Sequence, residues 1–217
     1  MHDLGTLAPL PAEAFVQLVS RSEAPTDGQE RDIVQRARSG DQQALGELYD
    51  LYFPRIYRYM LARTGNPAEA EDVTEEVFVK VLGGISGFQW RQAPFAAWLF
   101  RIAHNQVVSY ARKNGARRHD APLPANIADR VPDPLVRVED RLFFEQILDV
   151  ARALPQAQRE VLWLRFAVGL SVSDAARALG KQEGNVKVLQ HKAIARLQKL
   201  LAQSELERTV DRIAQPR

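Results

Sequence analysis

The chain of 217 residues contains no cysteine and only four histidines, His2, His104, His119 and His191, which lie far apart. Without cysteine it has no disulfide bond, no thiol nucleophile and none of the zinc sites that use thiolate ligands. The scattered histidines argue against a histidine-rich metal centre. Neither GxGxxG nor GxxxxGK[ST] occurs, so the usual nucleotide-binding loops are missing. We therefore expect no metal and no cofactor.

Long apolar runs are also missing. No run approaches the roughly 20 residues that a membrane-spanning helix needs. The first segment, MHDLGTLAPLPAEAF, lacks the basic start and the continuous apolar core of a signal peptide. Hydrophobic residues make up 46% of the chain and charged residues 26%, close to the averages for soluble globular proteins. The composition predicts a soluble, cytoplasmic protein without direct membrane insertion.

The formal net charge is only +2, yet charges of one sign cluster along the chain. Residues 69–76 contain five acidic side chains and no basic one, whereas residues 98–118 contain five basic side chains and no acidic one. Residues 181–200 contain five basic side chains and one acidic one. Two basic segments indicate a polyanion that is bound at two places. Two solvated helix faces are the alternative that charge alone leaves open.

Apolar residues recur with helical spacing along the chain, and no strand-like alternation is seen. We therefore predict an all-α fold. The predicted helices cover residues 31–39, 42–52, 54–63, 67–83, 96–113, 139–154, 156–166, 173–179 and 183–201.

Proline separates these helices into two groups. Pro122, Pro124, Pro132 and Pro134 fall within thirteen residues, a density that prevents a continuous helix and is typical of an extended linker. We therefore expect two small helical domains on a flexible tether, and we see no signal that they pack against each other. The expected divisions are an N-terminal extension (1–29), a first domain (30–118), a linker (119–136), a second domain (137–201) and a C-terminal tail (202–217).

The second group contains a helix-turn-helix pattern. Ser171 and Asp174 have the spacing of a capping box before an alanine-rich helix, and Gly180 can end that helix in the left-handed conformation. A longer basic helix follows. Its predicted buried stripe is Val186, Leu189, Ala193, Leu197 and Leu200. Its outward side, suited to a DNA major groove, is Asn185, Lys187, Val188, His191 and Lys192. An ordinary helical hairpin with a solvated lysine face would show the same pattern.

The predicted helix 96–113 has a polar face opposite its apolar stripe. At spacings of three or four residues, this face consists of Trp98, Arg101, Asn105, Ser109 and Arg112. Such a face suits an exposed nucleic-acid strand, because aromatic rings stack on unpaired bases and arginines neutralise phosphates. Phe88, Trp90 and Phe95 lie just upstream in a predicted loop. For Trp98 or Phe95 taken singly, the alternative is a place in the core.

The predicted helix from Pro67 has an acidic face. It carries Asp72, Glu75 and Glu76, with Phe78 at its flank. No histidine or nucleophile is placed to use these carboxylates in acid–base chemistry. The face indicates either simple solvation or a basic protein partner.

Four segments, taken in order, resemble the extracytoplasmic-function (ECF) class of bacterial RNA polymerase sigma factors, within the sigma-70 family. The resemblance runs from about residue 32 to residue 201. The segments are AEAEDVTEEVFVKV (68–81), PFAAWLFRIAHNQVVSYARKNGARR (94–118), LPQAQREVLWLRFAVGLSVSDAARALG (154–180) and GNVKVLQHKAIARLQKLL (184–201).

The resemblance implies a protein that is not an enzyme, binds core RNA polymerase at the clamp of its largest subunit, and directs initiation at particular promoters. Region 2 (30–118) would melt and read the −10 element, and region 4 (137–201) would read the −35 element as duplex. Positions that match −10 contacts are Phe88, Trp90, Trp98, Arg101, Asn105, Arg112, Lys113, Arg117 and Arg118. Positions that match −35 contacts are Arg165, Lys181, Asn185, Lys187, Val188, His191 and Lys192. Positions that match the polymerase-binding surface are Asp72, Glu75, Glu76 and Phe78.

The chain departs from the family pattern in two places. Many relatives carry arginine or serine where this chain has Val188 and Leu189, and threonine at Asn185, which leaves the −35 sequence open but not duplex binding. The loop before Trp98 is about one residue longer than in some relatives, which leaves the −10 preference open.

The resemblance also implies an anti-sigma protein, often membrane-linked, that covers the polymerase-binding and DNA-binding faces. Residues 1–30 carry five acids and one base, so these residues or the tail 202–217 are an alternative inhibitor acting in cis. A disordered tail is the simplest interpretation of the acidic extension.

Two other functions compete with promoter selection. A stand-alone helix-turn-helix regulator would need only the duplex-binding helix, and not the segment 94–118. A metal-dependent nuclease could use Asp72, Glu75 and Glu76, but that segment lacks a neighbouring basic face.

Overall fold

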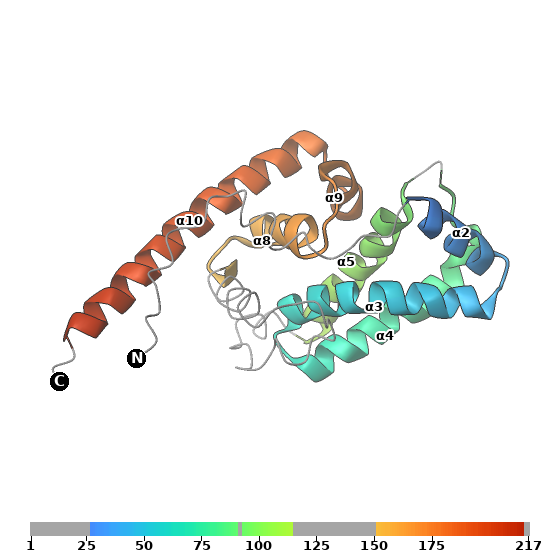
Figure 1. Cartoon of the computed structure of the whole chain (residues 1–217), viewed down its shortest axis with the longest axis horizontal. Helices are drawn as coiled ribbons and strands as arrows, with labels where there is room; N and C mark the ends of the chain where they lie inside the picture. The colour runs from blue at the N-terminus through green and yellow to red at the C-terminus, as the bar shows by residue number, and fades with distance from the viewer. Residues whose placement is uncertain (1–26, 91–92, 115–150, 215–217) are drawn as a thin grey trace.

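The computed structural model describes residues 27–90, 93–114 and 151–214, and every regular element in these ranges is a helix (Figure 1). The predicted all-α fold is therefore confirmed. In chain order the elements are α2 (Asp27–Arg38), α3 (Gln42–Thr64), α4 (Pro67–Gly84), η1 (Ile85–Gly87), α5 (Phe95–Asn114), α8 (Gln156–Leu162), η3 (Trp163–Ala167), α9 (Val172–Leu179) and α10 (Glu183–Ala214). The predicted linker 119–136 and most of the predicted helix 139–154 lie outside the described residues.

Local capping sets the helix ends, as the sequence predicts. The Asn66 side chain accepts hydrogen bonds from the backbone N–H groups of Ala68 and Glu69, and α4 begins there. The Ser171 hydroxyl accepts a hydrogen bond from the Asp174 N–H at 3.0 Å, which starts α9. Gly180 then ends α9 with a φ of 62°, a left-handed conformation that favours glycine.

The interruption expected at Pro54 is not observed. The predicted helices 42–52 and 54–63 form one continuous helix, α3, with Pro54 inside it. Proline removes one hydrogen-bond donor from the helix interior. The helix continues because residues on both sides of the proline, including Tyr52 and Ile56, are completely buried in the same core. Tertiary burial therefore outweighs the local preference of proline.

The helices α2–α5 form an N-terminal bundle around one apolar core. The predicted stripe of α4, Val73, Val77 and Val81, is buried, as are the central residues of α5. In the C-terminal group, α8–α10, Val186, Ala193 and Leu197 of the predicted α10 stripe are buried, and Leu189 and Leu200 are half-buried against the core. The helix α10 itself is longer than expected and extends to Ala214.

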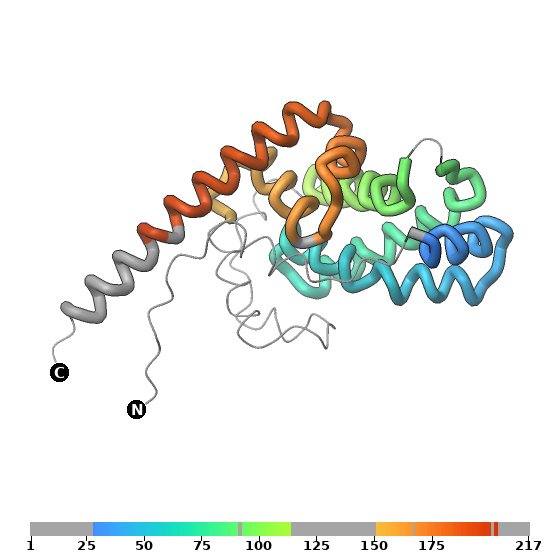
Figure 2. The backbone as a smooth tube through the Cα atoms, turned by 45° about the horizontal axis from the view of Figure 1, so that its top comes forward, coloured from blue at the N-terminus to red at the C-terminus, as the bar shows by residue number. Residues whose placement is uncertain are grey.

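The N-terminal bundle and the C-terminal group pack against each other, contrary to our expectation. Helix α5 lies against α9, and α3 lies against η3 (Figures 1 and 2). At this boundary Arg63 of α3 forms a salt bridge of 3.1 Å with Glu160 of α8. The two side chains are only 3% and 8% exposed. The packing signal was missed because the paired residues are 97 positions apart.

A second arginine crosses the same boundary. The Arg55 guanidinium donates a hydrogen bond of 2.5 Å to the Val168 carbonyl, and it lies over the rings of Tyr52 and Phe100. Burial lowers the pKa of Arg55 to about 10, while the charge of Glu30 opposes that shift. Both bundle arginines thus direct a buried charge towards the C-terminal group.

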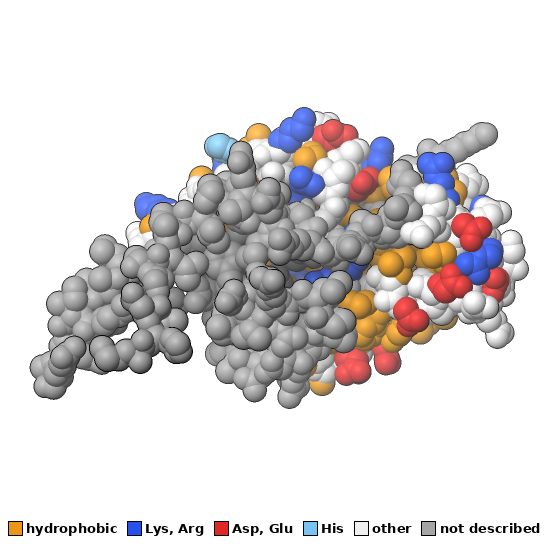
Figure 3. Space-filling model, viewed as in Figure 1, with side chains coloured by type: hydrophobic (Ala, Val, Ile, Leu, Met, Phe, Trp, Pro, Cys, Tyr) orange, Lys and Arg blue, Asp and Glu red, His pale blue; other side chains and the backbone are white. Residues whose placement is uncertain are grey.

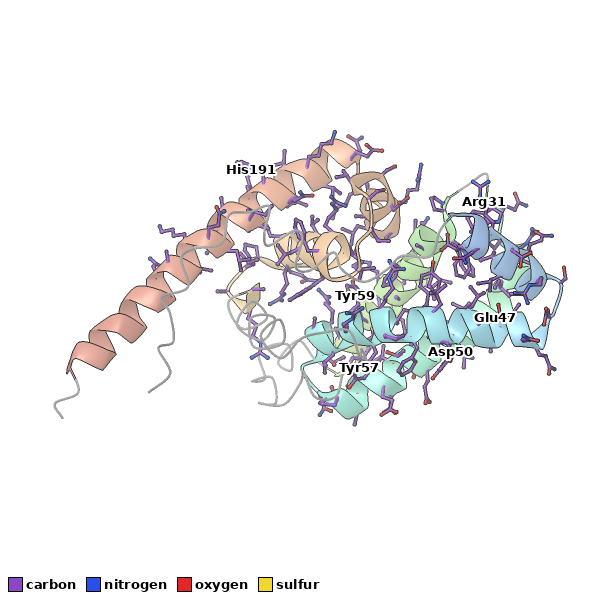
Figure 4. All side chains as sticks on the ribbon, in the orientation of Figure 1. Arg31, Glu47, Asp50, Tyr57, Tyr59 and His191 are labelled. Atoms are coloured by element: carbon purple, nitrogen blue, oxygen red, sulfur yellow. The ribbon has the colours of Figure 1, made fainter. Side chains whose placement is uncertain are left out.

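His104 of α5 is next to the Arg63–Glu160 ion pair. Its Nδ1 lies 3.1 Å from the Tyr59 hydroxyl, and Figure 4 shows Tyr59 on the side of α3 that faces the C-terminal group. Burial lowers the pKa of His104 below its usual 6.5; Glu160 raises it, and the charges of Arg63 and Lys181 lower it further. The folded protein therefore favours the neutral imidazole.

We predict that Arg63→Met and Glu160→Leu are each strongly destabilising and that the double variant is not. Removing one partner takes the opposite charge away from the other, buried one, which costs about 3–5 kcal/mol, whereas replacing both by apolar side chains is close to neutral. Urea unfolding of the wild type, both single variants and the double variant measures the free energies. Additive losses in the double variant would contradict a buried ion pair between these residues.

We predict a second, pH-dependent effect at the same boundary. Because the folded state lowers the pKa of His104, the unfolded chain binds more protons below about pH 6.5, and stability decreases as the pH falls through that range. Thermal melts between about pH 7.5 and about pH 5.5 should show a smaller decrease for His104→Asn than for the wild type. His191→Asn, at an exposed histidine, is the control and should behave as the wild type. An equal decrease in all three proteins would exclude His104 as the responsible group.

Candidate nucleic-acid interface and partner surface

The outward side of α5 is a basic, solvent-exposed face. Arg101 and Asn105 are exposed one turn apart, and Arg112 and Lys113 are exposed in its last turn. Ser109 between them is half-buried. Arg117 and Arg118, the remaining predicted contacts of this group, lie outside the described residues. The exposed part of the predicted −10 surface is thus a row of cationic and amide side chains.

The aromatic residues next to this face are mostly structural. Phe88 was predicted to contact DNA, but it is only 3% exposed and its ring contacts Trp90, Phe95 and Trp98 at centroid distances of 5.2–5.4 Å. In this structure its ring is therefore part of the core. Sequence could not distinguish these roles, because an aromatic residue in a loop suits either.

Trp98 is half-buried rather than outward-facing. Its ring lies against Phe95, and a Cβ at Gly84 would come within 3.3 Å of the indole Cζ2. The indole therefore packs over the end of α4, and glycine at position 84 makes room for it. Only the exposed part of the ring is accessible to a strand on the α5 face.

Arg31 adds a cation that the sequence did not indicate. Its guanidinium carbon lies 5.5 Å from the centroid of the half-buried Trp90 ring. Arg31 is exposed on α2, beside η1 (Figure 4). Since 59 positions separate the two residues, only the tertiary fold brings them together. The guanidinium keeps Trp90 in place at the edge of the predicted −10 surface.

The outward side of α10 is a second basic face. Its predicted residues Asn185, Lys187, Val188, His191 and Lys192 are all exposed, and Lys181 just before the helix is half-buried. Figure 4 shows His191 on the outer side of α10, away from α8. In Figure 3, Lys, Arg and His side chains follow this outer edge. The residues predicted for duplex contact thus share one accessible surface.

Arg165 does not belong to that free surface. Its Nε donates a hydrogen bond of 3.0 Å to the side-chain oxygen of Gln190, and its Nη1 donates to the Leu170 carbonyl. Burial lowers its pKa, an effect that Asp174 opposes. Arg165 is half-buried and connects η3 to α10, so it sets the orientation of the basic helix rather than extending from it.

The acidic face of α4 is largely accessible. Asp72, Glu75 and Glu76 are exposed, although Glu76 also accepts a hydrogen bond from the Gln106 amide of α5. Phe78, predicted to contact polymerase, is buried, and its ring lies 4.6 Å from that of Tyr49. Phe78 therefore supports the surface from beneath.

Three exposed apolar side chains extend this acidic face. Val79 is 68% exposed and Leu82 is 53% exposed on α4, and Tyr49 is exposed on α3. Burial, together with the charges of Glu75, Glu71 and Asp50, raises the pKa of the Tyr49 hydroxyl. Figure 3 shows hydrophobic side chains gathered with acidic ones over α3 and α4. In the sequence, Val79 and Leu82 are apolar residues that lie outside the valine stripe of α4. This position indicates exposed apolar side chains, and it is the signal that we missed.

The part of the chain that the structure describes contains no group of three or more His, Asp or Glu residues that could hold a metal ion. Among the same residues, no helix has both the length and the apolar character that crossing a lipid bilayer requires.

Comparison with known proteins matches two ranges of the chain to two known regions. Residues 48–117 match the family model for sigma-70 region 2, and residues 144–197 match that for sigma-70 region 4. The ECF RNA polymerase sigma factor SigD of Mycobacterium tuberculosis is 32% identical over 194 residues, which cover 84% of this chain and 89% of SigD. The chain belongs to the ECF sigma factor family.

Another ECF sigma factor, BldN of Streptomyces coelicolor, is 39% identical over 173 residues, which are 78% of this chain. The match spans 65% of BldN, slightly less than two thirds of its length. Among solved structures, the sigma factor RpoE of Bartonella quintana, in complex with the anti-sigma factor NepR, matches with a TM-score of 0.57 and 25% identity. That match covers 72% of this chain and 96% of the RpoE chain.

The family models place the acidic face of α4 and the basic face of α5 in region 2, and the basic face of α10 in region 4. Helix α2, which carries Arg31, precedes the region 2 match.

Proposed function

We propose that this ECF sigma factor binds core RNA polymerase in the cytoplasm and directs initiation at particular promoters, without catalysis of its own. The main support is the order of its surfaces. An acidic and apolar surface and a basic face lie in region 2, and a second basic face lies in region 4. A subunit that connects polymerase to two promoter elements needs these three surfaces.

In this proposal, the α5 face binds the melted −10 strand. Arg101, Arg112 and Lys113 neutralise phosphates, while Asn105 offers both a donor and an acceptor to an unpaired base. The exposed part of Trp98 and the half-buried Trp90 supply stacking surfaces at its edge. A duplex-only regulator has no use for such a single-strand surface.

The α10 face enters the major groove of the −35 duplex. A helix-turn-helix places the first turns of its second helix against base edges, and here those turns carry Asn185 and Val188. Lys187 and Lys192 contact phosphates, and Arg165 orients the helix through Gln190.

The polymerase-binding surface combines the exposed acids of α4 with Val79, Leu82 and Tyr49. Apolar side chains at the centre of an interface supply binding energy, and a charged rim supplies encounter rate and specificity. The clamp of the largest polymerase subunit is the partner that the family resemblance implies for this surface.

Reading both elements requires the two helical groups to separate. The names of the elements place them about 25 base pairs apart, which is roughly 85 Å at about 3.4 Å per base pair. A compact body of about 150 residues has a radius of gyration of about 15 Å. The packed arrangement is therefore too small to reach both elements at once, and binding to polymerase and promoter must break the contacts around Arg63 and Arg55.

An anti-sigma protein is the proposed regulator of these surfaces. The support is the solved structure of the similar RpoE with the anti-sigma factor NepR. Such a protein would cover the α4 surface and the two basic faces and keep the chain from polymerase.

Transcription in vitro with purified core polymerase tests the proposal directly. A library of promoter fragments should give initiation at a defined subset only when the chain is present. Duplex binding without initiation would instead support a stand-alone helix-turn-helix regulator.

We predict that Lys187→Ala with Lys192→Ala weakens −35 binding uniformly across sequences while core-polymerase binding persists. Each lost phosphate contact reduces the slope of log affinity against log salt by about 0.9, so the slope should decrease by about two. Fluorescence anisotropy of the holoenzyme on promoter duplex at several salt concentrations measures both quantities. Lys199→Ala, at an exposed lysine further along α10, is the control. Loss of polymerase binding with intact DNA affinity would reverse the assignment.

We predict that Asp72→Arg with Glu75→Arg weakens core-polymerase association about tenfold or more, because like charges across an interface repel. Glu76 is kept, since it accepts a hydrogen bond from Gln106 and its reversal would also disturb α4–α5 packing. Glu183→Arg, at an exposed acid on α10, is the control, and circular dichroism checks the fold of each variant. Normal holoenzyme formation by a folded double variant would exclude this surface.

A further inference from the structure

One apolar side chain lies in the middle of the basic α10 face. Val188 is 52% exposed, and among the α10 side chains that the structure describes (183–200, 202 and 203) it is the one large hydrophobic that is exposed. A single exposed valine is common on protein surfaces. The surroundings of Val188 are less common. It lies between Lys187, His191 and Lys192, and residues 184–199 contain no acid.

The fold fixes the direction in which Val188 points. Val186, Ala193 and Leu197 are buried against the rest of the C-terminal group, so the side of α10 that carries Val188 faces solvent. The Arg165 side chain bonds to Gln190 and to the Leu170 carbonyl, which anchors this part of α10 to η3. Val188 is thus held on the outer side of the helix, within its first two turns.

The chemistry of the major groove then restricts what Val188 can contact. Base edges in that groove present hydrogen-bonding groups, except for the C5 methyl group of thymine. A valine cannot donate or accept a hydrogen bond, so its contact with a G·C pair would leave polar base groups desolvated and unpaired. Contact with the thymine methyl group buries apolar surface of both the valine and the thymine.

We propose that Val188 reads the C5 methyl group of a thymine in the −35 duplex. The proposal rests on the duplex-binding role proposed above for α10 and adds a base preference to it. Asn185 lies three residues earlier on the same exposed face, and its carboxamide suits the N6 and N7 groups of an adenine in a neighbouring pair. The chain is therefore expected to favour an A·T pair opposite Val188 and a second one beside it.

The charges around Val188 favour DNA over a protein partner. The exposed neighbours on both sides are lysines and a histidine, which suit a polyanion, and Glu183 lies at the very start of the helix. An apolar side chain flanked by two lysines is the arrangement expected for contact with a thymine methyl between phosphates.

The test begins with holoenzyme reconstituted from core polymerase and the full chain. This holoenzyme selects promoters from a library that is randomised over the −35 region. In the selected duplex, each thymine is then replaced singly by deoxyuridine, which removes only the C5 methyl group. Affinity is measured for the wild type, Val188→Ser and Val188→Thr.

We expect one thymine whose replacement weakens wild-type binding about fourfold, the equivalent of one buried methyl group at about 0.8 kcal/mol. Val188→Ser should abolish that difference, and Val188→Thr, which keeps one methyl group, should retain part of it. Lys187→Ala is the matched control. It should weaken binding to the thymine duplex and to the deoxyuridine duplex equally, and so keep the ratio of the two affinities. Since Val188 is exposed, its variants should fold, and circular dichroism confirms this.

Two results would overturn the proposal while leaving promoter selection intact. One is the absence of any selected thymine in the −35 region. The other is a thymine-to-uracil difference that Val188→Ser leaves unchanged, which would assign the exposed valine to a protein contact instead. If the holoenzyme selects no promoter at all, the proposed function itself fails, and the base preference fails with it.

Discussion

The buried ion pair between Arg63 and Glu160 is the constraint that organises the packed molecule. Each charge is removed from water, and Glu160 is further satisfied by the Gln156 amide at 2.8 Å. Because a buried charge without its partner is strongly unfavourable, α3 and α8 are restricted to one relative position. The hydrogen bond from Arg55 to the Val168 carbonyl fixes the same position at a second point.

This constraint explains why the outer surfaces are free. The arginines and part of α5 join the two helical groups, while Arg101, Asn105, Arg112 and Lys113 of α5 remain exposed. The outer side of α10 is equally accessible, since its inner side packs on α8 and α9. The packed form therefore presents all three proposed binding surfaces, but it keeps the two basic faces too close for two separated promoter elements. The proposed function thus includes a separation whose free energy must come from polymerase and promoter contacts.

The candidate site was predictable where accessibility follows from helical spacing alone. Arg101, Asn105 and Lys187 are exposed as expected, because the opposite sides of α5 and α10 carry continuous apolar stripes. Phe88 and Phe78 are buried, which the sequence could not show, since aromatic rings are equally suited to a core and to a binding surface. The intramolecular bonds of Arg165 were not predictable for a similar reason: a guanidinium can contact phosphate or, as here, a side chain and a carbonyl of its own fold.

By itself the sequence determined the all-helical fold, most helix boundaries and the two basic faces. Capping by Asn66 and Ser171 and the left-handed turn at Gly180 depend on neighbouring residues only, so local patterns were sufficient. The tertiary structure alone decided that α3 continues through Pro54, that Arg31 covers Trp90 and that Arg63 pairs with Glu160. Each of these depends on burial or on contact between residues far apart in the chain, and the free energy of such contacts cannot be assigned before the partners are known.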